Sequence, residues 1–445
     1  MTHADDEELH AEKRRRGGFL VRSALSLVST SVVTAGLGFI FWTVAARMFS
    51  ASDVGESATA IAAMSLIAPF SLLGFGTALI AKLPSMSSGR AQLVSSAALV
   101  CAVVGGLVAL VCALVLPTSF LGLPGIGHDL HTTLIFMGGV SAHSVAMMLD
   151  VALLSVVGGG IQLKRNVVHA VVKLVLLVVF ALTLPRYGPL SIYASWFVAS
   201  VASIAVVGVL LLRQQRVPAG RILPRFSAIR ALRLQALEHH VLNLALVAPF
   251  FAMPIVANVV LGSEDAGYLY ATWSLAGFVF VLPIAMSTAL FASAARDSST
   301  IVTEFRFSLR NSMAACGAAN LLILPLGGLV LSIFGEAYAA NGRTVLTVLC
   351  VGGLGLVIRD HHVAVARITG DVGREAVLMV MLGTAELVGA AIGASRGGLL
   401  GLGLGWLAAV GFAVMICTPR VWCAYRGRLE VAAGRGLDGA AEAGH

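Results

Sequence analysis

Residues 92–116 read QLVSSAALVCAVVGGLVALVCALVL, a stretch without a single charged side chain. A helix of about 20 such residues crosses the roughly 30 Å of hydrocarbon in a bilayer. Comparable stretches lie near residues 20–46, 55–81, 131–157, 166–184, 189–212, 234–260, 267–292, 309–334, 343–368, 373–395 and 398–419. The sequence therefore predicts an all-α integral membrane protein with about 12 transmembrane helices.

The composition of the chain leads to the same fold class. Of its 445 residues, 58% are hydrophobic and 12% are charged, with a mean hydropathy of +0.92. An ordinary soluble domain carries roughly 25% charged residues. The predicted helices leave no room for a large soluble domain, and we expect residues 1–18 and 425–445 to form polar tails, the first of them disordered.

The distribution of Lys and Arg predicts the orientation in the membrane. With the N-terminus inside, 24 of the 30 basic residues fall on cytoplasmic segments, four fall on outside loops and two fall within spans. This asymmetry predicts a multi-pass protein of the bacterial plasma membrane with both termini in the cytoplasm. It also accounts for the net charge of +8 without a nucleic-acid partner.

Two short motifs indicate that the halves of the chain are a parallel repeat. The residues Asp53-Val54-Gly55 recur as Asp265-Ala266-Gly267, and the sequence SFLG at 119–122 recurs as SIFG at 332–335. The separation along the chain between the two copies is the same for both motifs to within one residue. We therefore expect an N-lobe at 19–212 and a C-lobe at 234–424, joined by a basic cytoplasmic linker at 213–233, which is a plan typical of transporters.

The same turns carry a resemblance to a known family. Residues 46–55, ARMFSASDVG, resemble the "AR.LS..D.G" turn of the multidrug, oligosaccharidyl-lipid and polysaccharide (MOP) exporter superfamily, and residues 334–338, FGEAY, resemble its "FG..Y" motif. Within the superfamily the chain is similar to the polysaccharide (O-antigen type) flippases. The resemblance implies two pseudo-symmetric six-helix lobes around a central cavity.

The resemblance also implies a cargo, which is a polyprenyl diphosphate-linked oligosaccharide moved from the inner to the outer leaflet. The implied partners are this lipid-linked saccharide, the lipid bilayer and a polysaccharide polymerase or glycosyltransferases. Flippases of the peptidoglycan precursor usually carry several basic residues on cavity-facing helices of the first lobe. Only Arg22 has that place here, which favours a secondary polysaccharide as the cargo.

Ionisable residues within the spans are the next candidates, because they are costly in lipid and so are expected to pair or to function. Asp150 and Lys173 lie roughly 12 Å deep on consecutive predicted helices and are expected to pair with each other. The repeat predicts a pairing with exchanged signs between Glu386 and the cluster Arg359-Asp360-His361-His362. Both pairs are consistent with latches between helices, and the acids and histidines of the second lobe are equally consistent with proton coupling.

A second group of candidates lies near the predicted cytoplasmic mouth between the lobes. Arg22 is at the inner end of the first span, and Glu238, His239, His240 and Asn243 are at the inner end of the seventh. Cationic groups and N–H donors at this place suit a diphosphate. The alternatives are a topology anchor for Arg22 and interfacial packing for the histidines.

Several other functions are disfavoured by what the sequence lacks. It has no GxxxxGK[ST] motif for ATP, no Cys/His spacing for a metal, and no motif that calls for a cofactor. The longest predicted outside loop, 117–130, carries only His128 and Asp129 as candidate catalytic groups, so an enzyme is not expected. The alternative that stays open is a proton- or sodium-coupled antiporter of small amphiphiles or drugs with the same architecture.

Overall fold

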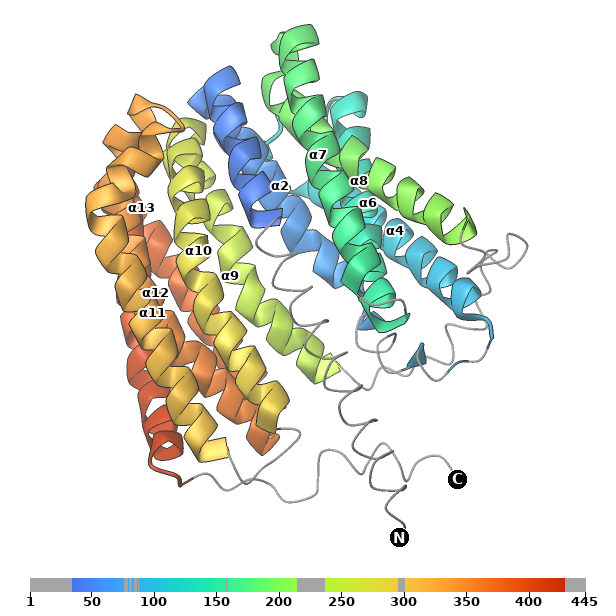
Figure 1. Cartoon of the computed structure of the whole chain (residues 1–445). Helices are drawn as coiled ribbons and strands as arrows, with labels where there is room; N and C mark the ends of the chain where they lie inside the picture. Colours follow the sequence, from blue (N-terminus) through green and yellow to red (C-terminus); the bar gives the residue numbers. More distant parts are fainter. Residues whose placement is uncertain are drawn as a thin grey trace. The chain divides into compact units, whose positions relative to one another are not determined.

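The computed structural model describes residues 34–75, 79, 82–83, 86, 88–156, 159–213, 237–294 and 301–428. The predicted N-terminal tail lies outside these residues, as do residues 214–233 of the linker and 429–445 of the C-terminal tail. The described elements are α-helices and one short 3-10 helix. They form two compact units, drawn in Figure 1, and each unit is described by itself.

Unit 1 comprises the described residues of Met1–Met48, Ile67–Val115 and Gly125–Gln235. Its first helix covers residues 34–48, which is the described part of the first predicted span. Four long helices follow: α4 (Arg90–Val115), α6 (Leu130–Val156), α7 (Gly159–Thr183) and, after the 3-10 turn η1 (Pro185–Tyr187), α8 (Gly188–Arg213). Helix α7 begins seven residues before the predicted start at 166, which places Arg165 inside a helix and not in a loop.

Unit 2 comprises the described residues of Phe49–Leu66, Leu116–Pro124 and Ala236–His445. It contains the short helix α5 (Thr118–Leu121) and the long helices α9 (Leu237–Leu261), α10 (Ser263–Ala294), α11 (Ile301–Ser332), α12 (Glu336–Thr369) and α13 (Val372–Tyr425). Helix α2 (Ala51–Ser71) belongs to unit 2 up to Leu66 and to unit 1 from Ile67.

Helix α2 starts earlier than the predicted span 55–81 because of its first turn. The Ser50 backbone N–H donates to Asp53 Oδ2 at 3.2 Å, and the Asp53 backbone N–H donates to Ser50 Oγ at 3.1 Å. This reciprocal pair is a capping box, which satisfies N–H groups that a helix start leaves without partners. The Ser and Asp of the turn motif therefore fix where α2 begins.

Helix α13 contains two of the predicted spans. Gly397 and Gly398 have non-helical backbone angles, and Gly398 has a φ of 60°. The chain reverses there, so that Gly393 lies against Gly401, each so close to the other's carbonyl that neither has space for a Cβ atom. Small residues allow this close approach of two helices in a membrane. The two limbs correspond to the predicted spans at 373–395 and 398–419.

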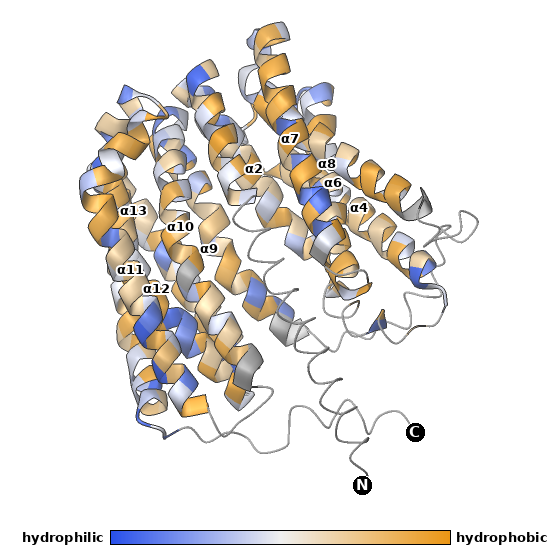
Figure 2. Ribbon diagram, viewed as in Figure 1, coloured by the Kyte–Doolittle hydropathy of each residue, from blue (hydrophilic) through white to orange (hydrophobic). Residues whose placement is uncertain are grey.

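The outer surfaces of the helices are apolar. Ten of the described helices are long and apolar enough to cross a bilayer. Helix α13 is counted once among these ten although it contains two of the predicted spans, and the described helix at 34–48 is too short to be counted. Figure 2 shows hydrophobic residues along most of the length of the helices. Many of the large apolar side chains are exposed; Val115 and Leu182, for example, are each 72% exposed. Such surfaces need lipid as their solvent, so the predicted fold class, an all-α integral membrane protein, is confirmed.

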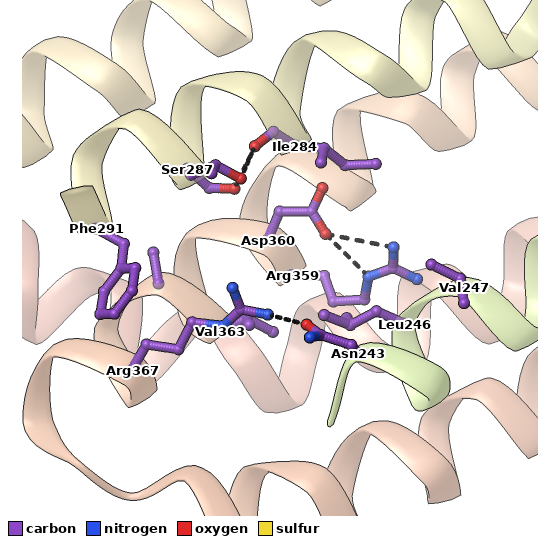
Figure 3. A pocket seen from close by; sticks show the side chains of 12 residues that line it. Asn243, Leu246, Val247, Ile284, Ser287, Phe291, Arg359, Asp360, Val363 and Arg367 are labelled. Carbon is purple, nitrogen blue, oxygen red and sulfur yellow. Dashed lines mark hydrogen bonds and ion pairs between the residues drawn. The ribbon is translucent and has the colours of Figure 1, made fainter. Parts of the chain in front are cut away.

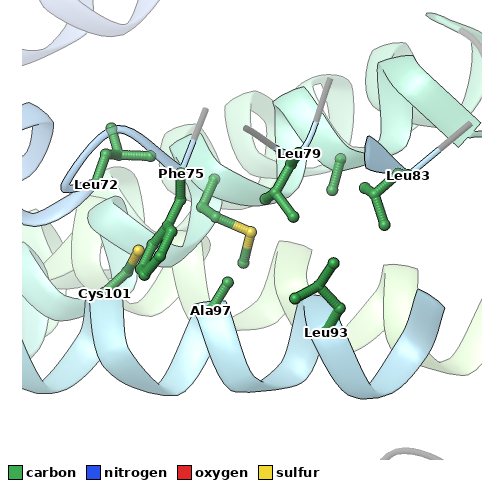
Figure 4. Packing of buried hydrophobic residues seen from close by; sticks show 9 residues of the cluster. Leu72, Phe75, Leu79, Leu83, Leu93, Ala97 and Cys101 are labelled. Carbon is green, nitrogen blue, oxygen red and sulfur yellow. The ribbon is translucent and has the colours of Figure 1, made fainter. Parts of the chain in front are cut away.

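The interior of unit 1 includes a tightly packed apolar cluster that Figure 4 shows. Leu72, Phe75, Leu79 and Leu83 follow α2 along the chain and lie against residues of α4 and α6. Cys101 of α4 is fully buried in this cluster and acts as a small apolar side chain. The segment after α2 is therefore held to unit 1 by burial of its leucines.

Candidate functional site

The charged centre of unit 2 is an ion-pair network between α12 and α13. Arg359 donates from Nη1 to Glu386 Oε1 at 3.0 Å, and its Nε and Nη2 each lie 3.3 Å from Asp360 Oδ1. Trp406 donates from Nε1 to the second Glu386 oxygen at 2.9 Å. All three charged side chains are buried. The predicted pairing of Arg359 with Glu386 is confirmed.

A cavity of about 250 Å³ lies beside this network, between α9, α10 and α12 (Figure 3). Its wall is mainly apolar, with Leu246, Val247, Ile284 and Phe291 among the lining side chains. The polar side chains that line it are Asn243, Ser287, Thr288, Arg359, Asp360 and Arg367. An apolar wall with a few placed polar groups is typical of a site for a small organic ligand.

Two polar atoms of the cavity residues are not satisfied by any residue that the structure describes. Arg367 donates from Nη2 to Asn243 Oδ1 at 2.8 Å. Its Nε, and the Oδ2 atom of Asp360, are buried and have no hydrogen-bond partner among the residues that the structure describes. Because nearly all buried polar atoms in proteins are hydrogen-bonded, these two call for an explanation.

The two histidines of the predicted cluster have local partners and do not line the cavity. His361 lies 2.9 Å from Ser308 Oγ and 2.8 Å from a carbonyl of its own helix. His362 lies 3.1 Å from Glu375 Oε2 and 3.2 Å from the carbonyl oxygen of Cys417. Both are buried between helices. Of the predicted cluster, only Arg359 and Asp360 therefore reach the cavity.

A further ion-pair network joins the end of α12 to α13. Arg420 contacts Asp371 Oδ2 at 2.5 Å and Thr369 Oγ1 at 2.6 Å, and its Nη1 lies 3.8 Å from Glu375. This network fastens the turn at Gly370, whose φ of 82° suits glycine. Among the described residues, no group of three or more His, Cys, Asp or Glu side chains could hold a metal ion.

In unit 1 the predicted pair of Asp150 and Lys173 is wrong. Asp150 is bound instead by Arg165, which approaches it at 2.8 Å from Nε and at 2.5 Å from Nη2. Arg165 is 5% exposed, and this forked geometry is the strongest that Arg and a carboxylate form. The reason for the error is the early start of α7, which brings Arg165 into the helix and next to α6.

Lys173 is held by aromatic rings and not by a carboxylate. Its Nζ lies 3.8 Å from the centre of the Trp196 ring and 4.8 Å from that of Phe41. His169, one turn earlier on α7, contacts Trp196 edge-on. A buried ammonium over two rings gains cation–π attraction in place of an ion pair. Lys173 thereby fixes α7 against α8 and the helix at 34–48.

The candidates near the predicted mouth are only partly described. Arg22 lies outside the described residues, and the side chains of Glu238 and His239 do as well. His240 is half-buried on α9. Asn243 lies one turn further along, where it lines the cavity and binds Arg367. Asn243 is therefore the one member of this group that the structure brings to the cavity.

Sequence reasoning missed three residues that complete these sites. Arg165 and Arg367 were assigned to cytoplasmic segments by their charge, although each lies within a helix and binds a side chain of a neighbouring helix. Ser287 gave no signal, since a serine in an apolar span has no distinctive pattern. To identify the two arginines, one would have to know how α7 packs against Asp150 and how α12 packs against Asn243.

Comparisons with known proteins identify the fold. No protein-family model and no curated protein sequence matches the chain. Among solved structures, an inward-facing multidrug resistance MATE family transporter of the MOP superfamily matches with a TM-score of 0.69 and 14% identity, over 91% of this chain and 99% of the other. The lipid II flippase MurJ in an inward closed conformation matches with a TM-score of 0.62 and 12% identity, over 91% of this chain and 90% of the other.

A third match has a different binding pocket. It is a MOP superfamily transporter from Pyrococcus furiosus, described as having a binding pocket of reversed polarity, with a TM-score of 0.61 and 12% identity over 91% of this chain and 95% of the other. The three matches share one fold although their described functions differ, and each covers nearly the whole of both chains. The chain therefore has the fold of the MOP superfamily transporters, as the motifs at 46–55 and 334–338 indicated.

Proposed function

We propose that the chain is a flippase that moves a polyprenyl diphosphate-linked oligosaccharide from the inner to the outer leaflet for cell-surface polysaccharide assembly. It works by alternating access of the lobes at 19–212 and 234–424, with 213–233 as the linker between them. Its place is the bacterial plasma membrane, with both termini in the cytoplasm. It acts as a carrier and not as an enzyme.

The observation that carries this proposal is the balance of buried charge. The buried carboxylates of the described spans, Asp360, Glu375 and Glu386, each contact an Arg or a His. In unit 1 the buried cation Lys173 has an aromatic cage and no carboxylate. An interior without excess negative charge does not favour a cationic amphiphile. It suits a cargo whose head is anionic at the diphosphate and neutral or polar beyond it.

The sequence motifs and the fold support the same cargo. The turn motif at 46–55 resembles that of the polysaccharide branch, and its Ser50 and Asp53 form the capping box of α2. The lipid II flippase MurJ has the same fold. Arg22, His239 and His240 are the proposed contacts of the diphosphate at the cytoplasmic mouth, where cationic groups and N–H donors suit phosphate oxygens. Glu238 and Asn243 are the proposed cavity residues beside them.

A deletion of the gene in its host tests the proposal. We expect loss of a surface polysaccharide together with accumulation of the polyprenyl diphosphate saccharide from which it is built. Mass spectrometry of the lipid extract would identify the cargo. Complementation by the wild-type gene should restore both. If the polymer and the lipid pool are unchanged in the deletion strain, the chain does not perform this step.

A second function, an ion-coupled antiporter of small amphiphiles, is favoured by one observation. Asp360 Oδ2 is buried and without a hydrogen-bond partner among the described residues, so the carboxylate has a free site for a proton or a sodium ion. Uptake of a dye into vesicles, driven by a proton or sodium gradient, tests this. Gradient-driven uptake that is lost in Asp360→Asn would favour the antiporter, and resistance to drugs on overexpression would agree with it.

A further inference from the structure

Two residues that line the cavity of unit 2 each carry a polar atom that no described residue satisfies, one an acceptor and one a donor. The acceptor is Asp360 Oδ2 and the donor is Arg367 Nε, both buried without a partner in the described part of the chain. A buried group left in this state costs about 1–3 kcal/mol unless something else satisfies it. A ligand that fits must therefore both donate and accept hydrogen bonds.

The charges around the cavity balance one another. Arg359 and Arg367 contribute two positive charges, and Asp360 and Glu386 contribute two negative charges. The cavity itself is lined by Arg359, Arg367 and Asp360; Glu386 does not line it but pairs with Arg359 at 3.0 Å, which leaves the whole set without net charge. Because like charges in a poorly solvated site repel strongly, the balanced set favours a neutral, polar ligand.

The size and the wall of the cavity restrict this ligand further. The volume of about 250 Å³ lies just below the roughly 300–1,000 Å³ of most small-ligand pockets, which is space for one ring and not for a whole oligosaccharide. Phe291 and Ile284 provide flat apolar contact, and Ser287 and Asn243 add polar contact (Figure 3). A ring with one apolar face and with hydroxyl groups around its edge would fit against this wall.

We propose that this cavity binds one neutral, hydroxyl-bearing sugar ring of the transported saccharide, with a sugar hydroxyl donating to Asp360 Oδ2 and a sugar oxygen accepting from Arg367 Nε. The inference rests on the proposed function and deepens it, because it assigns a saccharide subsite to unit 2 that is separate from the residues proposed to hold the diphosphate. It makes the cavity the part of the carrier that distinguishes a saccharide-bearing lipid from bare polyprenyl diphosphate.

The test compares the binding of two probes to the purified full chain in nanodiscs by native mass spectrometry. One probe is the lipid-linked saccharide extracted from the deletion strain, and the other is polyprenyl diphosphate without a saccharide. The wild type should bind the first about tenfold more tightly than the second. Ser287→Leu should fill the cavity and reduce this preference to less than about twofold, with unchanged binding of the bare lipid.

Ser287 is suited to this test because its hydroxyl bonds only to the Ile284 carbonyl of its own helix, at 3.1 Å. The matched control is Thr384→Leu, which removes a hydroxyl that also bonds only to its own helix but lies on an exposed face of α13. Asp360→Asn, which keeps the shape of the side chain, should reduce the preference as well. Thermal melting of each variant separates a loss of binding from a loss of folding.

The outcomes separate this inference from the proposed function. Equal binding of both probes by the wild type, or a preference that survives in Ser287→Leu, would overturn the saccharide subsite while the flippase function stands. A deletion strain that accumulates no lipid-linked saccharide would overturn the proposed function, and the subsite with it. Loss of preference in Ser287→Leu together with normal binding by Thr384→Leu supports the subsite.

Discussion

Ser52 Oγ lies 2.5 Å from Ser263 Oγ, although the two residues are 211 positions apart in the chain. They lie at the starts of α2 and α10, where the two copies of the repeated Asp-x-Gly turn begin. Gly55 and Gly267, the glycines of these turns, also approach the partner helix closely. The repeated motif is therefore a contact surface, within unit 2, at which the two copies meet.

Replacing either glycine should destabilise the protein. A Cβ atom on Gly55 would collide with the Ser263 carbonyl oxygen, and one on Gly267 with that of Ala51. We expect Gly55→Ala and Gly267→Ala each to cost about 1–3 kcal/mol, seen as a lower melting temperature in detergent. Gly317→Ala is the control, since Gly317 has open space around it within α11. Equal melting temperatures for all three variants would mean that the turns do not pack as described.

A double-mutant cycle tests the corrected ion pair of unit 1. Asp150→Ala and Arg165→Ala should each destabilise the protein, because each leaves a charge without its partner. The double variant should lose less stability than the two single variants lose together, with a coupling free energy of about 1–3 kcal/mol. A cycle of Asp150→Ala with Lys173→Ala should show almost no coupling. A larger coupling to Lys173 than to Arg165 would restore the pairing that the sequence predicted.

The partner of Asp150 shows what the sequence alone could and could not supply. The long apolar runs predicted the transmembrane helices, because a segment of that length and hydropathy has no other stable conformation in lipid. The run Gly158-Gly159-Gly160 was interpreted as a break, so that Lys164 and Arg165 were placed in a loop. The structure begins α7 at Gly159, and these seven extra helical residues, about two turns, were enough to exchange the partner.

The candidate site shows a similar limit. The offset of the internal repeat led from Lys173 to Glu386 and so to its pairing with Arg359, although the first-lobe pair that served as the template does not form. The cavity itself needed the placement of α9 and α10 against α12, and no pattern in the sequence brings Asn243 to Arg367. Ser287 matters because of the cavity beside it. No sequence pattern identifies such a residue until the packing of the helices is known.

Substitution of Lys173 should separate packing from charge. Lys173→Ala leaves a gap between Phe41 and Trp196, so we expect a loss of about 2–4 kcal/mol and low abundance in the membrane. Lys173→Met fills the same space without a charge and should keep near-normal abundance. The measurement is membrane abundance, with the fluorescence of Trp196 as a local probe. If Lys173→Met is abundant but does not transport, the ammonium itself has a functional role.

A pH dependence is expected at the start of α6. The Thr132 hydroxyl and backbone N–H both donate to Asp129, which holds the pKa of this carboxyl below its usual value of 3.8. Since the pKa is depressed in the folded state, the stabilisation is present at neutral pH and is lost as the pH falls through the folded-state pKa. Asp129→Asn should therefore lower the melting temperature at pH 7 and have less effect near pH 3. An effect that grows on acidification would contradict this assignment.

The most direct test of the proposed function is reconstitution. Proteoliposomes containing only the purified chain receive the lipid-linked saccharide from the deletion strain, and a membrane-impermeant reagent reports how much of it reaches the outer leaflet. We expect transfer that requires the protein and proceeds without ATP. Transfer of the saccharide-bearing lipid should be faster in wild-type vesicles than in Ser287→Leu vesicles. Transfer no faster than in protein-free vesicles, with a correctly folded protein and with or without an ion gradient, would contradict the proposed function.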